Sequence, residues 1–270
     1  MIYTDQMMRE IRLNKPPSRI VCLVPSITEL LYDLGLFEQI AGITKFCIHP
    51  ETVFRSKPHI GGTKKINHLK IAEINPDLII ANKEENTKDD IEELEKKYPV
   101  WISDIKTLEH AIQMISMLGE VTGTQSKALE LNNTITQQFN LISKASNVRS
   151  LYLIWRNPYM AAGAGTFIDD MMERCGFENV LNQSNRYPSL DKKQISELNP
   201  ELILLSSEPY PFKQKHILEI KEIVPDSNIQ LVDGEFFSWY GSRLAGAPGY
   251  FNTLISKLNN RNPASSIYEN

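Results

Sequence analysis

The feature that most constrains the fold of this chain is a short pattern that occurs twice. Residues 71–82 read IAEINPDLIIAN, and residues 195–206 read ISELNPELILLS. In each copy a helix-like stretch meets an Asn-Pro pair, and a continuous apolar run follows. Proline cannot continue a helix and pushes the residue before it, here Asn75 or Asn199, toward an extended conformation. An unbroken apolar run is typical of a strand buried on both faces of a parallel sheet. The pattern therefore predicts two copies of one helix–strand unit.

Each copy of the pattern is preceded and followed by further apolar strand segments. These segments are residues 19–24 and 100–102 in the first half, and residues 150–155 and 229–232 in the second. A helix is expected to open at Ser26, which has Glu29 at capping-box spacing, and another near Thr166. Each half then reads strand, helix, strand, helix, strand. This alternation predicts an α/β fold with a mostly parallel sheet flanked by helices in each half.

A long helical pattern lies between the two halves. Apolar residues recur every three or four positions over residues 124–146, and no proline interrupts them. This segment has no flexible Gly/Ser linker, so we expect one long rigid helix to join two lobes. The predicted organisation is an N-terminal α/β lobe over 1–122, an interlobe helix over 123–146 and a C-terminal α/β lobe over 147–270.

Composition and charge exclude several classes of function. The chain has 29 basic and 33 acidic residues, a net charge of −4, which argues against binding nucleic acid through bulk positive charge. No segment has the run of about 18 apolar residues that a membrane span needs. The N-terminus lacks the features of a signal peptide, and the three cysteines lack C-x-x-C spacing. The sequence as given therefore predicts a cytoplasmic protein, with a periplasmic or cell-surface location as the alternative if an export signal lies outside it.

Several motifs together resemble one family of binding proteins. They are the stretch from Asp5 to Arg9, VPSITELL at 24–31, Gly61-Gly62-Thr63, the repeated Asn-Pro pattern and GTFIDDMMERCGFEN at 165–179. The chain resembles the class III substrate-binding proteins of ABC importers, the helical-backbone metal receptor group. The resemblance implies a non-catalytic, monomeric protein that requires no cofactor. It also implies a cobalamin-like corrinoid or an iron chelate bound in a cleft between the lobes, and an ABC permease as partner.

The residues themselves indicate where such a ligand would bind. In an open α/β sheet, ligands bind beyond the carboxyl ends of the strands, so the loops after the predicted strands supply the candidates. Aromatic rings there would form flat walls, and arginines would donate in pairs to polar or anionic edges of a large planar ligand. The candidate ligand-binding residues are Lys64, Glu84, Trp155, Arg156, Tyr159, Arg186, Tyr187, Glu208, Tyr210, Phe212, Trp239, Tyr240 and Arg243.

One loop also suggests a metal site. Cys47 and His49 lie two residues apart, so in an extended loop both side chains would point the same way. A thiolate and an imidazole suit a soft metal or the axial position of a chelate. A packed cysteine beside an ordinary loop histidine is the alternative.

Two other functions stay open at the level of the sequence. One is a chelatase-like enzyme that uses His49, Glu84 and Glu208 as metal or proton-transfer groups. The other is a cytoplasmic sensor or storage protein for a metal chelate. An enzyme needs histidine and glutamate within hydrogen-bond reach of one another, whereas a binder needs aromatic walls.

Overall fold

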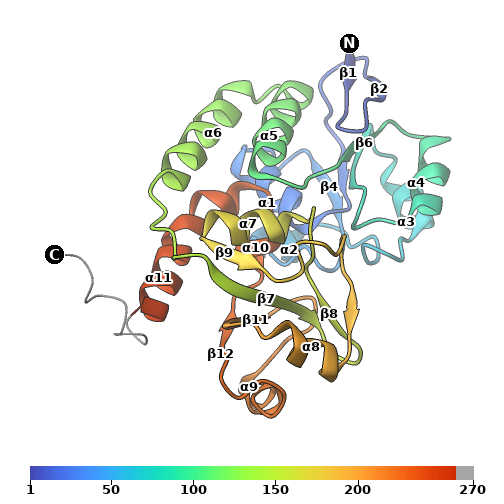
Figure 1. Cartoon of the computed structure of the whole chain (residues 1–270). Helices are drawn as coiled ribbons and strands as arrows, with labels where there is room; N and C mark the ends of the chain where they lie inside the picture. The colour runs from blue at the N-terminus through green and yellow to red at the C-terminus, as the bar shows by residue number, and fades with distance from the viewer. Residues whose placement is uncertain (260–270) are drawn as a thin grey trace. The chain divides into compact units, whose positions relative to one another are not determined.

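The structure, a computed structural model, describes residues 1–259 and divides into two compact units (Figure 1). Unit 1 consists of Met1–Ile105, Glu109–Thr136 and Trp239–Ala245. Unit 2 consists of Lys106–Leu108, Gln137–Ser238 and residues 246–259. The short segment Trp239–Ala245, which the sequence places with the C-terminal lobe, therefore packs with the N-terminal residues.

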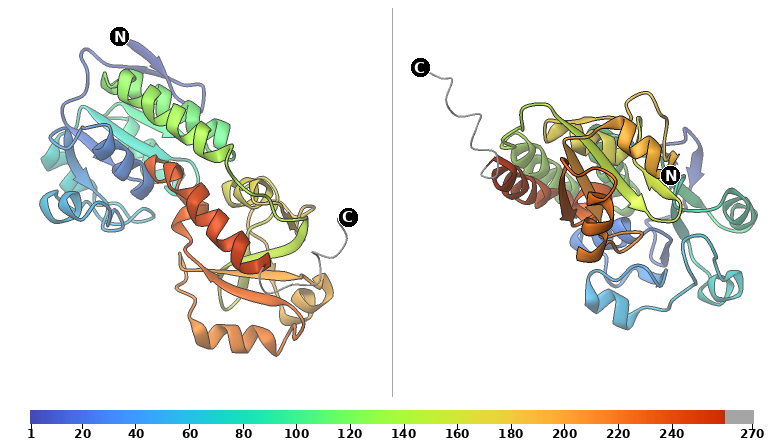
Figure 2. Two further views of the ribbon diagram at one scale, coloured as in Figure 1. Left: turned by 90° about the vertical axis from the view of Figure 1, so that its left-hand side faces the viewer. Right: turned by 60° about the horizontal axis from the view of Figure 1, so that its bottom comes forward.

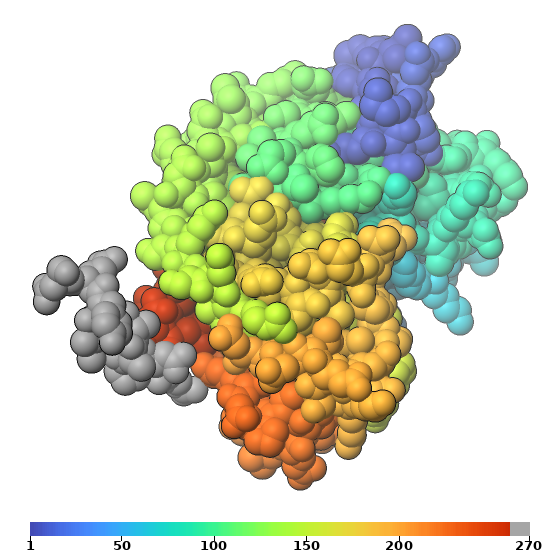
Figure 3. Space-filling model, viewed as in Figure 1, coloured from blue at the N-terminus to red at the C-terminus, as the bar shows by residue number. Residues whose placement is uncertain are grey.

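Unit 1 is built on a parallel sheet of four strands. Their order is β4-β3-β5-β6, with bounds Ile40–Ile43, Ile20–Cys22, Leu78–Asn82 and Val100–Ser103. Every residue of β3 and β5 is buried, as their continuous apolar runs predict. A separate antiparallel hairpin of β1 (Ile2–Thr4) and β2 (Glu10–Arg12) stands out on the surface at the N-terminus (Figure 3).

The helices of unit 1 are amphipathic and bury their apolar faces against this sheet and against each other. They are α1 (Pro25–Asp33), α2 (Glu51–Ser56), α3 (His68–Ile74), α4 (Lys88–Glu95), α5 (Leu108–Thr122) from Glu109, α6 (Gln125–Phe139) as far as Thr136, and the 3-10 turn η1 (Ser242–Ala245).

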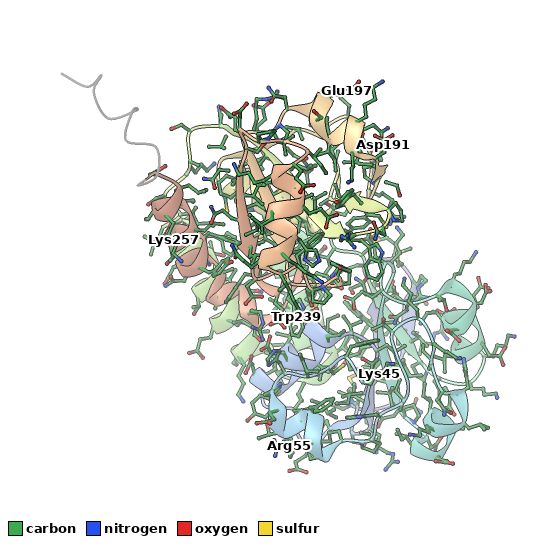
Figure 4. The ribbon with its side chains drawn as sticks, turned by 90° about the horizontal axis from the view of Figure 1, so that it is seen from below. Lys45, Arg55, Asp191, Glu197, Trp239 and Lys257 are labelled. Carbon is green, nitrogen blue, oxygen red and sulfur yellow. The ribbon has the colours of Figure 1, made fainter. Side chains whose placement is uncertain are left out.

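Unit 2 contains a mixed sheet. Its order is β10-β8-β7-β11-β12, with bounds Ser189–Leu190, Tyr159–Ala161, Val148–Trp155, Leu202–Ser206 and Asn228–Val232, and β9 (Phe177–Asn179) also pairs with β7. Strands β7, β9, β11 and β12 are parallel, whereas β8 and β10 pair antiparallel. The helices are α7 (Phe167–Arg174), α8 (Lys192–Leu198), α9 (Gln214–Lys221), α10 (Glu235–Ser238) and α11 (Ala247–Asn259). Helix α9 lies beside β12, and Asp191 and Glu197 mark the two ends of α8 (Figures 2 and 4).

The repeated sequence pattern forms the same local structure in both units. Each copy is a short helix, α3 or α8, followed by a fully buried central strand, β5 or β11. The extended conformation expected for the residue before each proline is wrong. Asn75 and Asn199 are left-handed, with φ of 50° and 44°. Asparagine tolerates this conformation, which closes the helix at its C-terminus, so the cap determines the backbone here.

A pair of polar contacts accompanies each copy of the pattern. Arg19 donates its Nε to the Ile74 carbonyl at the end of α3, and Arg149 donates to the Leu198 carbonyl at the end of α8. In return, the Asp77 carboxylate accepts the backbone N–H groups of Ser18 and Arg19. Glu201 accepts the backbone N–H of Arg149 in the same way. Each helix end is thereby tied to the start of the neighbouring strand.

The helix predicted over residues 124–146 is shorter than expected. Helix α6 ends at Phe139, and residues 140–147 are irregular. The Asn252 side chain donates to the Leu141 carbonyl at 3.0 Å and accepts the Ser143 N–H at 2.8 Å. Asn140, Ser143, Ser146 and Asn147 are weak helix formers, so these alternative partners for the backbone end the helix.

The capping box predicted at Ser26 is also absent. Helix α1 begins at Pro25, and its N-cap residue Val24 makes no side-chain cap bond. Proline is well suited to the first helical position, because its φ is already helical and its missing N–H has no partner there in any case. Glu29 is thus left to make a different contact, described below.

Candidate functional site

The loops after the strands of unit 1 gather at one edge of its sheet. Because β3, β4 and β5 are parallel, their carboxyl ends share this edge. The loop after β4 meets the Gly-Gly loop through Lys45 N–H, which donates to the Gly61 carbonyl at 2.8 Å. Lys64 extends its ammonium group to the Glu84 backbone carbonyl in the loop after β5. The structure therefore brings the two first-lobe candidates, Lys64 and Glu84, together.

An exposed aromatic ring at this edge was not among the predicted site residues. Phe46, in the loop after β4, is 50% exposed, and its neighbour Ile48 is 46% exposed. The Lys45 ammonium group lies 5.0 Å from the centre of the Phe46 ring. Gly62 passes close beneath, since a Cβ added there would lie 3.1 Å from the ring. The signal in the sequence was an aromatic residue within a strand-end loop, next to a lysine.

The Cys47 side chain is packed inside unit 1. It is fully buried, and its Sγ lies 3.2 Å from the hydroxyls of both Thr28 and Thr44. Burial raises the pKa of the Cys47 thiol to about 11 despite these hydrogen bonds, so the group keeps its proton near neutral pH. Among residues 1–259 there is no group of three or more His, Cys, Asp or Glu side chains that could hold a metal ion. The packing favours a buried thiol over a metal ligand.

The other half of that proposed pair, His49, lies against Trp239. Their ring centres are 5.7 Å apart in an edge-to-face arrangement. The Arg243 guanidinium covers Trp239 at 4.8 Å and donates to both carboxylate oxygens of Glu29, at 2.7 and 3.0 Å. Burial raises the pKa of Glu29, and the Arg243 charge partly opposes this. Arg243 thus anchors Trp239–Ala245 on α1 of unit 1.

Tyr240 fixes the same segment to the loop after β5. Its hydroxyl donates to the Glu85 carboxylate. Burial first, and then the neighbouring Glu85 charge, raise the pKa of Tyr240 well above its usual value. Gly241 comes so close to α1 that an added Cβ would lie 2.5 Å from the Ser26 carbonyl oxygen. Trp239 and Tyr240 are each 7% exposed, so both rings pack within the protein.

In unit 2 an aromatic cluster follows β7 and β11. Trp155, at the end of β7, is 39% exposed. It contacts Tyr210 edge-to-face, with ring centres 5.7 Å apart, and Tyr210 contacts Phe212 at 4.9 Å. Phe212 belongs to the core of unit 2 and is 6% exposed. The structure therefore joins three predicted site residues, of which Trp155 and Tyr210 form the accessible part.

Arg156 and Tyr159 share one glutamate that the sequence did not single out. Arg156 Nε lies 2.9 Å and 3.1 Å from the two carboxylate oxygens of Glu219, on α9, and the Tyr159 hydroxyl donates to the same group. Although burial opposes it, hydrogen bonds from Tyr159 and Arg156 lower the pKa of Glu219. The guanidinium is held beside Tyr210 with its charge balanced inside unit 2.

Glu208 is held by the ends of β11 and α10. The Ser238 hydroxyl donates to its carboxylate at 2.6 Å, and the Ser206 hydroxyl donates to its backbone carbonyl. Gly234 leaves room for this arrangement, because an added Cβ would lie 2.8 Å from Glu208 Cγ.

The remaining two candidates lie on the loop before β10. Arg186 is exposed and left-handed, with φ of 62°, and Tyr187 is half-buried. The backbone of Arg186 pairs with Ala164 and Gly163, which ties this loop to the residues before α7.

None of the helices in residues 1–259 is long and apolar enough to cross a membrane.

The two units define an α/β ligand-binding protein whose polar and aromatic loops follow the carboxyl ends of parallel strands. The sequence profile described as "Periplasmic binding protein" matches residues 20–223, and the chain belongs to that family. Members of the family bind ligands without transforming them, so the expectation of a binder is confirmed and the chelatase-like enzyme is not favoured.

The chain is similar to several characterised or solved members. It is 25% identical, over 74% of its length and 67% of the relative's, to an uncharacterized ABC transporter substrate-binding lipoprotein, YvrC, of Bacillus subtilis. It is 23% identical, over 93% of its length and 91% of the relative's, to a vitamin B12-binding protein of Pectobacterium carotovorum. The crystal structure of the periplasmic vitamin B12 binding protein BtuF of Vibrio cholerae superposes with a TM-score of 0.77, at 20% identity, covering 90% of this chain and 98% of that one. This likeness confirms the predicted fold class.

Proposed function

We propose that this protein binds a corrinoid such as cobalamin, or a related planar iron chelate, and passes it to an ABC importer. The residues that we expect to contact the ligand lie in strand-end loops, which each unit contains. The names of the relatives support this choice, since one is a vitamin B12-binding protein and another an ABC transporter substrate-binding lipoprotein.

The observation that carries the proposal is the placement of exposed rings beside cations at the ends of parallel strands. In unit 1 the exposed ring is Phe46, next to Lys45. In unit 2 it is Trp155, which precedes Arg156 in the chain and contacts Tyr210, and Tyr210 in turn contacts Phe212. Flat apolar faces suit the body of a macrocycle, and cations suit its amide or carboxylate edge. A sugar or an amino acid would leave much of this aromatic surface uncovered.

A chelated metal fits these residues better than a bare ion. A free divalent ion needs three or four convergent His, Cys, Asp or Glu ligands. Residues 1–259 hold no such cluster, and the Cys47 thiol is buried and protonated. The metal of a corrinoid or haem arrives with its own equatorial ligands. The protein then needs only aromatic side chains that contact the faces of the macrocycle and polar groups that contact its edge.

The proposal places the protein outside the cytoplasm, in place of the cytoplasmic location that the sequence suggested. The B. subtilis relative is named as a lipoprotein and the V. cholerae one as periplasmic. A permease partner follows from the same names. A cytoplasmic sensor or storage protein would bind the same ligands without a permease.

Titration of the purified protein with cyanocobalamin, haemin and a ferric catecholate complex tests the proposal. Binding is followed by the visible spectrum of the chelate and by quenching of tryptophan fluorescence. We expect saturable, one-to-one binding of one of the three, in the nanomolar to micromolar range. No saturable binding of any of them overturns the proposal.

A further inference from the structure

His216, a residue outside every predicted site, has both ring nitrogens engaged within unit 2. It lies in the first turn of α9 and is 3% exposed. Its Nδ1 receives the backbone N–H of Lys213 at 2.8 Å, which caps the helix. Its Nε2 lies 3.2 Å from the hydroxyl oxygen of Tyr210.

The contact with Lys213 determines which nitrogen carries the proton. A backbone N–H can only donate, so Nδ1 must be the acceptor and carries no hydrogen. Burial, assisted by the charges of Lys215 and Arg156, lowers the pKa of His216 and keeps the ring neutral near pH 7. A neutral imidazole has one N–H, which must therefore be on Nε2. That N–H points at the Tyr210 oxygen.

The direction of this hydrogen bond fixes the role of the Tyr210 hydroxyl. Its oxygen accepts from His216, so its own hydrogen must be donated elsewhere. Within residues 1–259, no protein acceptor pairs with the Tyr210 hydrogen. The hydroxyl is a half-buried donor at the rim of the aromatic cluster, beside the Trp155 ring.

We propose that Tyr210 donates a fixed hydrogen bond to an acceptor oxygen on the edge of the bound chelate, and that His216 is the positioning residue that sets this direction. The acceptor is an amide carbonyl or a carboxylate oxygen. This inference rests on the proposed function, because it assigns a contact within the same ligand site. It explains why the third residue of α9, whose side chain accepts the N–H of the N-cap residue Lys213, is a histidine where Glu or Gln is usual.

The alternative is that Tyr210 serves only as a ring. It contacts Trp155, Phe212 and His216, with ring centres 4.9 to 5.7 Å apart. Phenylalanine would keep all three contacts, so Tyr210→Phe isolates the hydroxyl. At position 216, asparagine keeps an acceptor near Nδ1 for the Lys213 N–H but cannot reach Tyr210.

The test is a titration of wild type, Tyr210→Phe, His216→Asn and the double variant with whichever of cyanocobalamin, haemin and the ferric catecholate complex wild type binds. Tyr3→Phe, in the N-terminal hairpin, is the matched control. Losing a hydrogen bond to a desolvated acceptor is expected to weaken binding about ten-fold in Tyr210→Phe, and losing its orientation about three-fold in His216→Asn. The double variant should bind no more weakly than Tyr210→Phe, because His216 acts through that hydroxyl. Tyr3→Phe should match wild type.

Three results overturn the inference. One is Tyr210→Phe binding like Tyr3→Phe, and another is a double variant whose loss is the product of the two single losses. The third needs neither ligand nor variant, since nitrogen-15 NMR reads the tautomer of His216 directly. The proton on Nε2 at pH 7 supports the inference, and a proton on Nδ1 contradicts it. If wild type binds none of the three chelates, the proposed function falls and this inference with it, whereas binding without an effect of Tyr210→Phe removes the inference alone.

Discussion

The side chains of Cys47 and Arg243 end in groups that bind metals and anions, and in unit 1 both contact protein partners. Two threonine hydroxyls surround the Cys47 sulfur, and Glu29 faces the Arg243 guanidinium. The contact of Arg243 with Glu29 joins residues 214 positions apart, and that of Cys47 with Thr28 joins residues 19 positions apart. Residue type and loop position suggested that both side chains bind a ligand. Their protein partners depend on the tertiary fold, so the sequence could not show that these side chains are already engaged.

The three thiols are expected to be unreactive in the folded protein. Cys22, Cys47 and Cys175 are all fully buried, and burial raises the pKa of each. Because the thiolate is the reactive species, Ellman's reagent at pH 8 should modify none of them natively and all three in urea. Rapid native modification of Cys47 would show an accessible thiolate and restore the metal-ligand hypothesis.

Replacement of Arg243 should lower the free energy of unfolding even when the positive charge is kept. Lysine keeps the charge but loses the two-donor fork to Glu29, and we expect Arg243→Lys to lower the free energy of unfolding by about 1 kcal/mol. Arg243→Ala leaves a mostly buried carboxylate unpaired and should cost about 3 kcal/mol. Urea unfolding measures both.

The control is the exposed pair of Arg55 and Glu51, one turn apart on α2. Arg55→Lys should change the stability by less than about 0.5 kcal/mol, since exposed pairs contribute little. Equal effects of Arg243→Lys and Arg55→Lys would mean that the anchor does not hold Trp239–Ala245 on unit 1.

At the scale of elements, the continuous apolar runs were enough to predict the central strands. Strands β3, β5 and β11 are buried throughout, and short apolar runs bounded by Pro and polar residues favour a strand over a helix. The ends of the helices were harder to predict from the sequence. The left-handed caps at Asn75 and Asn199 follow from asparagine's tolerance of that conformation, which outweighs the restriction from the proline that follows. The end of α6 depends on Asn252, more than one hundred residues away in the chain.

The acidic residue of each repeat should stabilise the link between helix and strand. Asp77 accepts from Ser18 N–H, Ser18 hydroxyl and Arg19 N–H, whereas Glu201 accepts from Arg149 N–H. From the number of hydrogen bonds lost, we expect Asp77→Ala to lower the free energy of unfolding by about 2 kcal/mol and Glu201→Ala by about 1 kcal/mol. Urea unfolding at pH 7 measures the two values.

The effect of Asp77→Ala should also depend on pH. Burial opposes ionisation of Asp77, but its hydrogen bonds from Ser18 and Arg19 lower the pKa below 3.8. A carboxylate with a lowered pKa stabilises the folded state above the unfolded pKa, and this contribution is lost as pH falls through the folded one. The gap between wild type and Asp77→Ala should therefore narrow below pH 3.8. A gap that is the same at acidic and neutral pH would mean that the carboxylate charge is not involved.

At the scale of the whole molecule, the repeated pattern predicted two α/β halves. The rule that ligands bind beyond the carboxyl ends of parallel strands predicted which loops contain candidate ligand-binding residues. That rule identified Trp155, Arg156, Tyr210 and Glu208, which the fold brings to one region of unit 2. It could not assign Trp239–Ala245 to unit 1, because that depends on the contacts with Glu29 and Glu85. Phe46 was overlooked because a single aromatic residue in a loop is common, and only its exposure marks it.

The central claim is that exposed aromatic rings in strand-end loops contact a planar chelate. Calorimetric titration with cyanocobalamin tests it most directly, comparing wild type with Phe46→Ala and Trp155→Ala. Both rings are well exposed, at 50% and 39%, so we expect little loss of stability. If the claim holds, each variant binds at least about ten-fold more weakly, the loss expected for an aromatic contact with the ligand. Unchanged affinity in both variants, with wild type binding normally, would contradict it.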